Sequence, residues 1–302
     1  MTDALVVGEA LIDIVTPLNE APTEYVGGSP ANVAIGLARL GHSTELATWI
    51  ADDERGRRIW KHLDGEAVRI HHGSIDAERT PTATALLNEE GKATYEFDLE
   101  WRVPGTLAPI SGAHLHFGSF SATLDPGGAQ VRGFAAEARA NSTISYDPNA
   151  RPALMGTPSE ARPKMEEGIA VADVVKASDE DIQWFYGVDD PADVIPRWLG
   201  MGVSLVILTR GPAGVVAATK DEERHFPAQD IKVVDSVGAG DSLMSGLLSG
   251  LLDGGYLGGA DARAKLQAAT LDELAPAIQR ALDCADITVS RAGANPPRRD
   301  EL

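Results

Sequence analysis

The sequence has little of several features on which whole classes of protein depend. It holds one cysteine, Cys284, in 302 residues, so no disulfide can form within the chain. No run of 18 apolar residues is present, which argues against a membrane-spanning helix. Positive charge is also scarce, since 26 Lys and Arg against 45 Asp and Glu give a net charge of −19. We therefore expect neither a nucleic acid nor an anionic membrane as a partner.

Two common nucleotide-binding motifs are missing as well. The chain lacks the Gly-x-x-x-x-Gly-Lys-Ser/Thr of P-loop enzymes and the early Gly-x-Gly-x-x-Gly of dinucleotide enzymes. Its start has no basic segment followed by an apolar stretch, so we expect no signal peptide and a cytoplasmic protein. Short apolar runs alternate with helical patterns, which predicts an α/β fold with a mostly parallel sheet and helices on both faces. A chain of this length can form one such domain, residues 1–302.

The most informative stretch is Asp-Ser-Val-Gly-Ala-Gly-Asp, residues 235–241. A β-branched segment before it, residues 231–234, predicts a strand end, and the apolar run 243–252 after it predicts a buried helix. Glycines at a helix start let the backbone approach a ligand, and the free N–H groups there favour an anion such as phosphate. Asp241 is therefore either a base for a hydroxyl that attacks phosphorus or an acidic residue favoured by the helix dipole.

This stretch resembles the second signature of the PfkB/ribokinase family of sugar kinases, usually Asp-Thr-x-Gly-Ala-Gly-Asp, with Ser236 in place of the Thr. The resemblance implies that Asp241 is the catalytic base. It also implies an anion hole formed by the N–H groups of Gly238, Ala239, Gly240 and Asp241. For the whole chain it implies a ribokinase-like fold with a small β-sheet lid, ATP and Mg²⁺ as cofactors, and K⁺ as a further candidate.

A second stretch, residues 27–41, reads Gly-Gly-Ser-Pro-Ala-Asn and continues into a helical pattern that ends at a glycine. Its spacing matches the first signature of the same family. The resemblance implies that Gly27, Gly28 and Asn32 line the sugar site. Residues 8–13, Gly-Glu-Ala-Leu-Ile-Asp, resemble the opening of fructokinases, in which the aspartate that matches Asp13 hydrogen-bonds sugar hydroxyls.

Alternating residues on both sides of a polar turn, residues 89–92, predict a β-hairpin. Tyr95 and Phe97 fall on one face of it, and Trp101 lies just beyond. An aromatic face on a strand belongs either to the core or to a surface that packs on a sugar. By resemblance, a lid of two discontinuous segments, about residues 11–27 and 80–102, closes over the sugar, with Phe97 rather than Trp101 as the contact. Lids of this family often pair, so a homodimer is a candidate assembly.

Polar residues follow a predicted strand at residues 143–146, at the edge where α/β sheets place ligands. They form the sequence Asp147-Pro-Asn-Ala-Arg151, which resembles a matching family segment. The resemblance implies Asn149 as a polar sugar contact and Arg151 as a cation near the substrate or the transferring phosphate. His114 and His116 alternate on another predicted strand without a third ligand nearby, so we interpret them as structural.

Other segments resemble the nucleotide side of the family. Residues 209–214, Thr-Arg-Gly-Pro-Ala-Gly, are like its Thr-x-Gly-x-x-Gly loop. Ser178-x-x-Asp181 replaces the usual Asn-x-x-Glu, which makes Asp181 a candidate for water-mediated Mg²⁺ binding, while helix capping by Ser178 explains the same residues. The implied nucleotide contacts are Lys176, Thr209, Gly211, Gly214, Gly238, Gly240 and Asn295, the last in a C-terminal segment that borders the adenine pocket in the family.

We therefore interpret the chain as an ATP-dependent kinase that transfers the γ-phosphoryl group to a primary hydroxyl of a sugar. Fructose is the expected sugar because the quoted segments look most like those of bacterial fructokinases. The alternatives are 2-keto-3-deoxygluconate and ribose. A hypothesis of another class is a sugar sensor that has the fold without turnover, and such a protein would bind sugar without releasing ADP.

Overall fold

The computed structural model describes residues 2–16, 21–87 and 93–302. Within them, one sheet has nine strands in the order β13-β12-β11-β10-β9-β8-β1-β4-β5. Strand β12 is antiparallel to both β11 and β13, and all the other neighbours pair in parallel. The strands are β1 (Ala4–Val7), β4 (Thr44–Ala47), β5 (Arg69–Ile70), β8 (His114–Gly118), β9 (Ile144–Asp147), β10 (Val174–Ser178), β11 (Leu205–Thr209), β12 (Val215–Ala218) and β13 (Glu223–Phe226). The predicted mostly parallel α/β sheet is confirmed.

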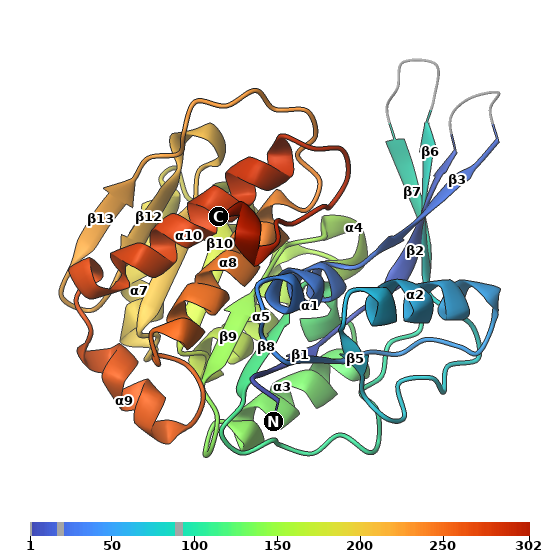
Figure 1. The fold of residues 1–302 in the computed structure, drawn as a ribbon, viewed down its shortest axis with the longest axis horizontal. Coiled ribbons are helices and arrows are strands. Elements are labelled where there is room, and N and C mark those ends of the chain that lie inside the picture. Colours follow the sequence, from blue (N-terminus) through green and yellow to red (C-terminus); the bar gives the residue numbers. More distant parts are fainter. Residues whose placement is uncertain (1, 17–20, 88–92) are drawn as a thin grey trace.

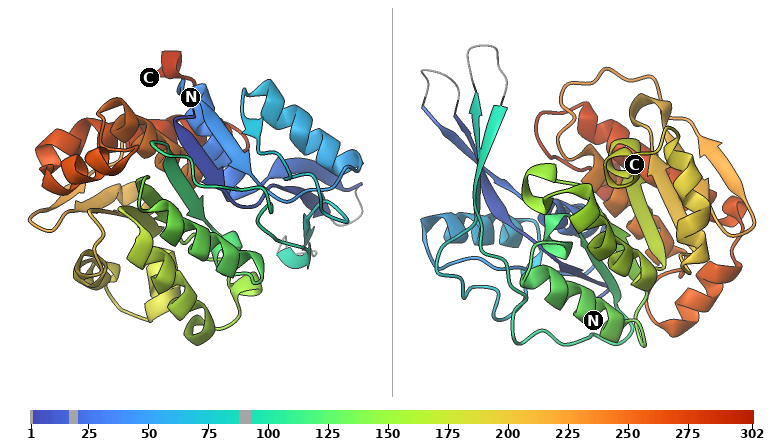
Figure 2. Two further views of the ribbon diagram at one scale, coloured as in Figure 1. Left: turned by 90° about the horizontal axis from the view of Figure 1, so that it is seen from below. Right: turned by 180° about the vertical axis from the view of Figure 1, so that it is seen from behind.

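Helices cover both faces of this sheet, each over its own hydrophobic core (Figures 1 and 2). One face carries α1 (Ser29–Arg39), α2 (Glu54–Gly65), α8 (Ala239–Asp253), α9 (Ala260–Ala268) and α10 (Leu271–Val289). The other face carries α3 (Gly127–Ala138), α5 (Pro158–Val171), α6 (Asp179–Tyr186) and α7 (Ile195–Gly200). A short helix, α4 (Pro152–Met155), follows β9. No helix in the described ranges is long and apolar enough to cross a membrane.

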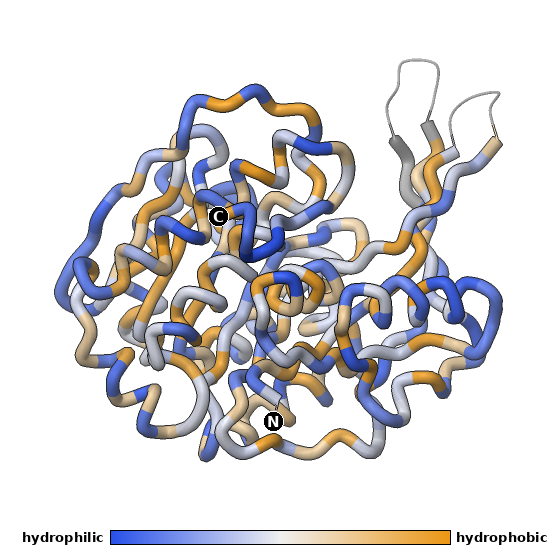
Figure 3. The backbone as a smooth tube through the Cα atoms, viewed as in Figure 1, coloured by the Kyte–Doolittle hydropathy of each residue, from blue (hydrophilic) through white to orange (hydrophobic). Residues whose placement is uncertain are grey.

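The predicted buried helix is α8, which packs tightly against α10 and α1. A Cβ added to Gly250 would lie 2.6 Å from the Cα of Ala277 on α10, and one on Gly36 of α1 would lie 2.1 Å from the Oγ of Ser245. These contacts need small residues, and the apolar composition of α8 contrasts with the mostly hydrophilic α2 (Figure 3). The middle and the end of α8 are therefore packed closely against α1 and α10.

A second sheet projects from the side of the first (Figure 1). Its strands are β2 (Leu11–Thr16), β3 (Thr23–Gly27), β6 (Thr82–Leu87) and β7 (Ala93–Asp98), in the order β3-β2-β6-β7. The predicted hairpin is present as the antiparallel pair β6 and β7, although its turn falls on residues 88–92, outside the described ranges. Trp101 is a core residue whose indole N–H donates to the carbonyl of Ser121 at 2.7 Å.

One predicted strand is wrong. Residues 231–234 are irregular, and the side chains of Val233 and Val234 are exposed. The N–H of Val234 donates to the carbonyl of Val289 at the end of α10, at 2.8 Å. β-branched residues favour an extended backbone, but a strand also needs a partner strand, and here the partner is a helix end.

His114 and His116 are structural, as predicted. The ring of His114 hydrogen-bonds Thr143 and Ser145, and that of His116 hydrogen-bonds Ser145. Burial lowers the pKa of both rings to about 3. No group of three or more His, Cys, Asp or Glu in the part of the chain that the structure describes is arranged to hold a metal ion.

Candidate active site

Within the described residues, the turn into α8 leaves two backbone N–H groups without a carbonyl acceptor. Gly238 precedes the helix with φ at 75°, a conformation that favours glycine, and a Cβ there would lie 2.6 Å from that of Ala294. The N–H of Ala239 donates to the carbonyl of Ser236 at 3.2 Å. Among the described residues, no carbonyl accepts from the N–H groups of Gly240 and Asp241. These two groups, at the positive end of a 15-residue helix, suit an anion.

Asp241 lies in this first turn and is 8% exposed. Its Oδ1 accepts from the hydroxyl of Ser29 at 2.6 Å, and its Oδ2 accepts from the amide of Asn32 at 2.8 Å. Both donors come from the first turn of α1. The packing of α1 against α8 thus joins the two stretches that the sequence marked separately.

Asp13 and Gly27 lie side by side on β2 and β3. A Cβ on Gly27 would lie 1.9 Å from the Oδ2 of Asp13, so only glycine leaves room for this carboxylate. Gly28, with φ at 111°, approaches the carbonyl of Glu9 so closely that a Cβ there would be 2.5 Å from that oxygen. Burial raises the pKa of Asp13 to about 6, and the guanidinium of Arg151 opposes this shift.

Gly27→Ala is expected to raise the KM for sugar at least tenfold, because the new methyl group must displace the Asp13 carboxylate. The loss of one hydrogen bond to a charged group corresponds to about 1.5–3 kcal/mol. The KM for ATP should stay near the wild-type value. Gly133→Ala on α3 is a matched control, since a Cβ there meets nothing within 4 Å. Equal sugar KM values for the two variants would show that Asp13 has no part in sugar binding.

The sequence analysis missed Glu9, which lies between β1 of the large sheet and β2 of the second sheet. The residue is 4% exposed, and its Oε2 has no hydrogen-bond partner in the described part of the chain. Burial raises the pKa of Glu9 to about 7, although hydrogen bonds from Ser119 and Ser121 and the charge of Arg151 lower it. An acidic residue between two apolar runs was the available signal.

Glu9 makes stability depend on pH in a definable window. Between its ordinary pKa of 4.5 and about 7, the folded protein binds a proton that the unfolded chain has released. The free energy of unfolding therefore falls as pH rises through this window. Glu9→Gln removes the effect. The Tm of this variant minus that of the wild type should therefore increase from about pH 5 to about pH 8. Parallel Tm curves in thermal unfolding would contradict the assignment.

Asn149 and Arg151 lie in the loop after β9. The guanidinium of Arg151 is exposed and donates to the Oδ1 of Asn149 at 2.7 Å, and Asn149 has φ at 38°. The structure thus pairs these two residues with each other at the end of the strand, near Glu9 and Asp13. Phe97, the other predicted sugar contact, is partly buried on β7 opposite Ala83 of β6. The roles of all three in sugar binding stay predictions.

Asp181 holds this loop in place. Its Oδ1 accepts from the N–H of Ala150 at 2.7 Å, and its Oδ2 accepts from the N–H of Ser178 at 3.0 Å. The hydroxyl of Ser178 accepts from the N–H of Asp181, which completes a capping box on α6. The capping interpretation of these residues is confirmed, whereas a water-mediated metal contact by Asp181 stays a prediction.

Lys176 lies beside the turn into α8. Its ammonium donates to the Oδ2 of Asp147 at 2.8 Å, with both side chains buried, and lies 3.0 Å from where a Cβ on Gly240 would be. Burial alone would lower the pKa of Lys176, but the carboxylates of Asp147, Asp181 and Asp241 raise it. A permanent positive charge therefore stands next to the free N–H groups.

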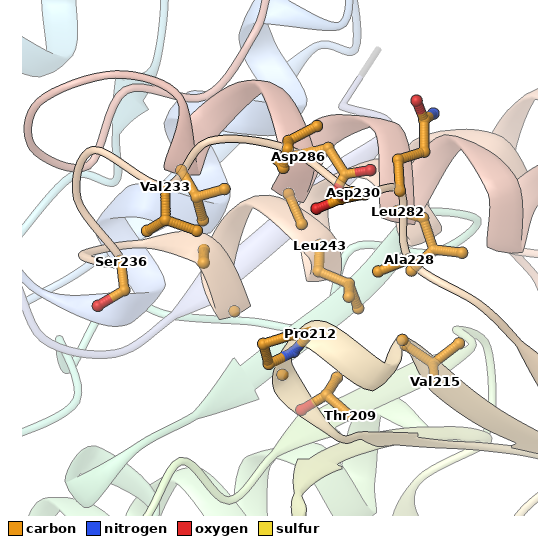
Figure 4. Close-up of a pocket in the computed structure, with 18 residues that line it drawn as sticks. Thr209, Pro212, Val215, Ala228, Asp230, Val233, Ser236, Leu243, Leu282 and Asp286 are labelled. Atoms are coloured by element: carbon orange, nitrogen blue, oxygen red, sulfur yellow. The ribbon is translucent and has the colours of Figure 1, made fainter.

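A cavity of about 490 Å³ opens on the same turn (Figure 4). Thr209, Gly211 and Gly214 line it, as do Ala239 and Gly240. Much of the remaining wall is apolar and includes Pro212, Val215, Leu243, Leu282 and Val289. An apolar cavity with an anion site at one end fits a nucleotide, whose base is flat and whose phosphates are charged.

Asn295 is not among the residues that line this cavity. Its Oδ1 accepts from the guanidinium of Arg39 at 2.6 Å, and Arg39 also donates to the carbonyl of Pro296. The side chain therefore ties the C-terminal segment to α1. This contact uses the amide oxygen alone, and the contact of Asn295 with the nucleotide stays a prediction.

These parts have a consistent order in space. The apolar cavity leads to the free N–H groups and Lys176. The Asp241 carboxylate lies in the same turn, and Asp13 and Gly27 lie on the second sheet, where β3 leads into α1. Such an order suits the transfer of a phosphoryl group from a nucleotide to a hydroxyl, for which a positioned base and preorganised positive groups are the main requirements.

Comparisons with known proteins agree with this chemistry. Residues 1–301 match the description "pfkB family carbohydrate kinase". A fructokinase from Klebsiella pneumoniae is 32% identical over 310 residues, which cover 98% of this chain and 97% of that protein. An aminoimidazole riboside kinase from Salmonella enterica is 26% identical, with a TM-score of 0.80 over 96% of this chain and 94% of that one. A Vibrio cholerae fructokinase double mutant, in a fructose, ADP and potassium ion bound form, has a TM-score of 0.80 at 24% identity and covers 97% of this chain and 94% of that one. The chain belongs to the pfkB family of carbohydrate kinases.

Proposed function

We propose that this carbohydrate kinase transfers the γ-phosphoryl group of ATP to a primary hydroxyl of fructose. The observation that carries the proposal is the placement of the buried Asp241 carboxylate beside the free N–H groups at the start of α8. Fructose is favoured because the Klebsiella relative, which this chain matches over nearly its full length, is named a fructokinase. The expected cytoplasmic location belongs to the same proposal.

Asp241 takes the proton of the attacking hydroxyl, an aid worth roughly 10²–10⁴ in rate. The N–H groups of Gly240 and Asp241, with the ammonium of Lys176, hold the charge that develops on the transferring group. One such donor is worth about 3–4 kcal/mol of transition-state stabilisation. Asp13, Asn32, Asn149 and Arg151 orient the sugar, and Thr209, Gly211 and Gly214 hold the nucleotide.

Mg²⁺ would neutralise phosphate charge when bound. The chain offers hard oxygen donors for it, as Mg²⁺ requires. The Oδ1 of Asp147 is buried without a hydrogen-bond partner among the described residues, and the Asp181 carboxylate is close enough to raise the pKa of Asp147. Asp181 would hold the ion through water. K⁺ is a second candidate ion, present in the Vibrio cholerae structure.

The four-stranded sheet would close over the sugar as a lid. Closure excludes water, which would otherwise compete as the phosphoryl acceptor. Phe97 would pack on the sugar. An exposed residue on this sheet, Tyr25, supports pairing of two lids in a homodimer, which light scattering of the purified protein would test.

The testing experiment is a coupled ADP-release assay with fructose, ribose, 2-keto-3-deoxygluconate and aminoimidazole riboside, each with and without K⁺. We expect fructose to give the highest kcat/KM. A clear preference for another compound would change the sugar and keep the kinase. If calorimetry showed fructose binding but no compound in the panel caused ADP release, the sugar-sensor hypothesis would be favoured instead.

A further inference from the structure

Ser29 lies between the two glycines and the asparagine of the first signature, at a position to which neither signature assigns a role. We propose that Ser29 is a positioning residue for Asp241, which holds one oxygen of the base so that the other faces the sugar hydroxyl. The inference rests on the proposed kinase function and adds a residue to its machinery.

The two oxygens of Asp241 are held by donors of different kinds. The hydroxyl of Ser29, which is 9% exposed, donates to Oδ1 at 2.6 Å, and this is the only hydrogen that a serine side chain can give. The amide of the less buried Asn32 donates to Oδ2 at 2.8 Å and keeps a second N–H and an oxygen for a ligand. Each carboxylate oxygen has two lone-pair sites, so each could also accept the hydroxyl of the sugar. Because Asn32 is the less buried of the two donors, the geometry assigns the proton to Oδ2, the oxygen on its side.

Ser29 is a rigid anchor for this contact. A Cβ on Gly8 would lie 2.3 Å from the ring of Pro30, which shows how closely the first turn of α1 packs on the end of β1. Gly36, two turns further along α1, packs in the same way on Ser245 of α8. This close packing keeps the hydroxyl of Ser29 at the carboxylate of Asp241 and so favours one orientation of that carboxylate. Preorganisation of this kind is what general-base catalysis requires.

A purely structural hydrogen bond between α1 and α8 is the alternative. The two roles differ in what they predict for the pH profile. A donor to a carboxylate favours its charged form, so its removal should raise the pKa of the base. The other charged groups that face Asp241 are Lys176 on β10 and Asp147 on β9, and a change at Ser29 leaves both in place.

The test compares Ser29→Ala with Ser245→Ala, which removes another buried serine hydroxyl from the same helix pair. The hydroxyl of Ser245 donates to the backbone carbonyl of Ser242 and does not contact Asp241. Single-turnover phosphoryl transfer is measured at saturating ATP with fructose, or with whichever sugar the panel favours. We expect Ser29→Ala to be about 10–100-fold slower, since a hydrogen bond to a charged group is lost. The acidic limb of the pH–rate profile of this variant should lie about one pH unit above that of the wild type, the equivalent of a tenfold change. The Kd for sugar should stay within threefold of the wild-type value.

Two further variants retain a hydrogen-bond donor at position 29, so the test does not depend on whether Ser29→Ala folds well. Ser29→Thr retains the hydroxyl and should restore most of the rate, and Ser29→Cys keeps a weak donor and should fall between Ala and wild type. If Ser29→Ala and Ser245→Ala had equal rates and equal acidic limbs of the pH–rate profile, the inference would be overturned. The hydrogen bond of Ser29 would then be purely structural. In that outcome the wild type still phosphorylates sugar, whereas a failure of the proposed function would appear as no sugar-dependent ADP release by the wild type.

Discussion

Asp241→Asn should lower kcat by about 10²–10⁴, the range that a positioned general base contributes. The asparagine has nearly the same shape and stays in the first turn of α8, but it cannot take a proton from the sugar hydroxyl. Sugar affinity, measured by calorimetry, should change only a few-fold. The ADP-release assay with fructose gives kcat.

Asp253→Asn is the matched control, because it makes the same chemical change at the other end of α8. Asp253 pairs with Arg280 and Arg299, well outside the catalytic constellation. We expect this variant to keep wild-type kcat. If Asp241→Asn retained kcat within tenfold of that control, Asp241 would not be the base.

Lys176→Met should have the second large effect, on both rate and stability. Loss of one positive donor at the anion site corresponds to about 10²–10³ in kcat. The same change leaves the buried Asp147 carboxylate without its partner, which typically costs about 3–5 kcal/mol of unfolding free energy. Thermal unfolding and the ADP-release assay measure the two effects separately.

The double variant Lys176→Met/Asp147→Asn separates stability from chemistry. It removes both charges of the pair, so much of the lost stability should return. The rate should stay low, because the missing ammonium is what we expect to act on the phosphate. A double variant with wild-type kcat would show that Lys176 serves the fold alone.

The parts of the site that sequence could predict are those in which a local pattern dictates both backbone and chemistry. Glycines before an apolar run predicted the start of α8, because only that arrangement leaves free N–H groups beside Asp241. The paired glycines before α1 predicted a second ligand-facing turn in the same way. The alternation of short apolar runs with helical segments predicted the parallel sheet.

Other features depend on contacts between distant residues. Ser29 and Asp241 are 212 positions apart, and nothing local to either one shows their hydrogen bond. Glu9 looked like an ordinary polar residue between strands, since its burial depends on the serines that follow β8. The apolar wall of the cavity beside the start of α8 comes partly from the end of α10, which local periodicity presents only as a core helix.

The wrong strand prediction has the same origin. Residues 231–234 have the composition of a strand, but the neighbour that the fold provides is the end of α10. A tertiary contact decided the outcome there against the local pattern.

The most direct measurement is a crystal structure of the protein with fructose and a non-hydrolysable ATP analogue. We predict the primary hydroxyl of the sugar within about 2.6–3.2 Å of Oδ2 of Asp241, the reach of a general base. The γ-phosphate should lie over the N–H groups of Gly240 and Asp241. A sugar bound away from Asp241, or a triphosphate bound away from the start of α8, would contradict the account.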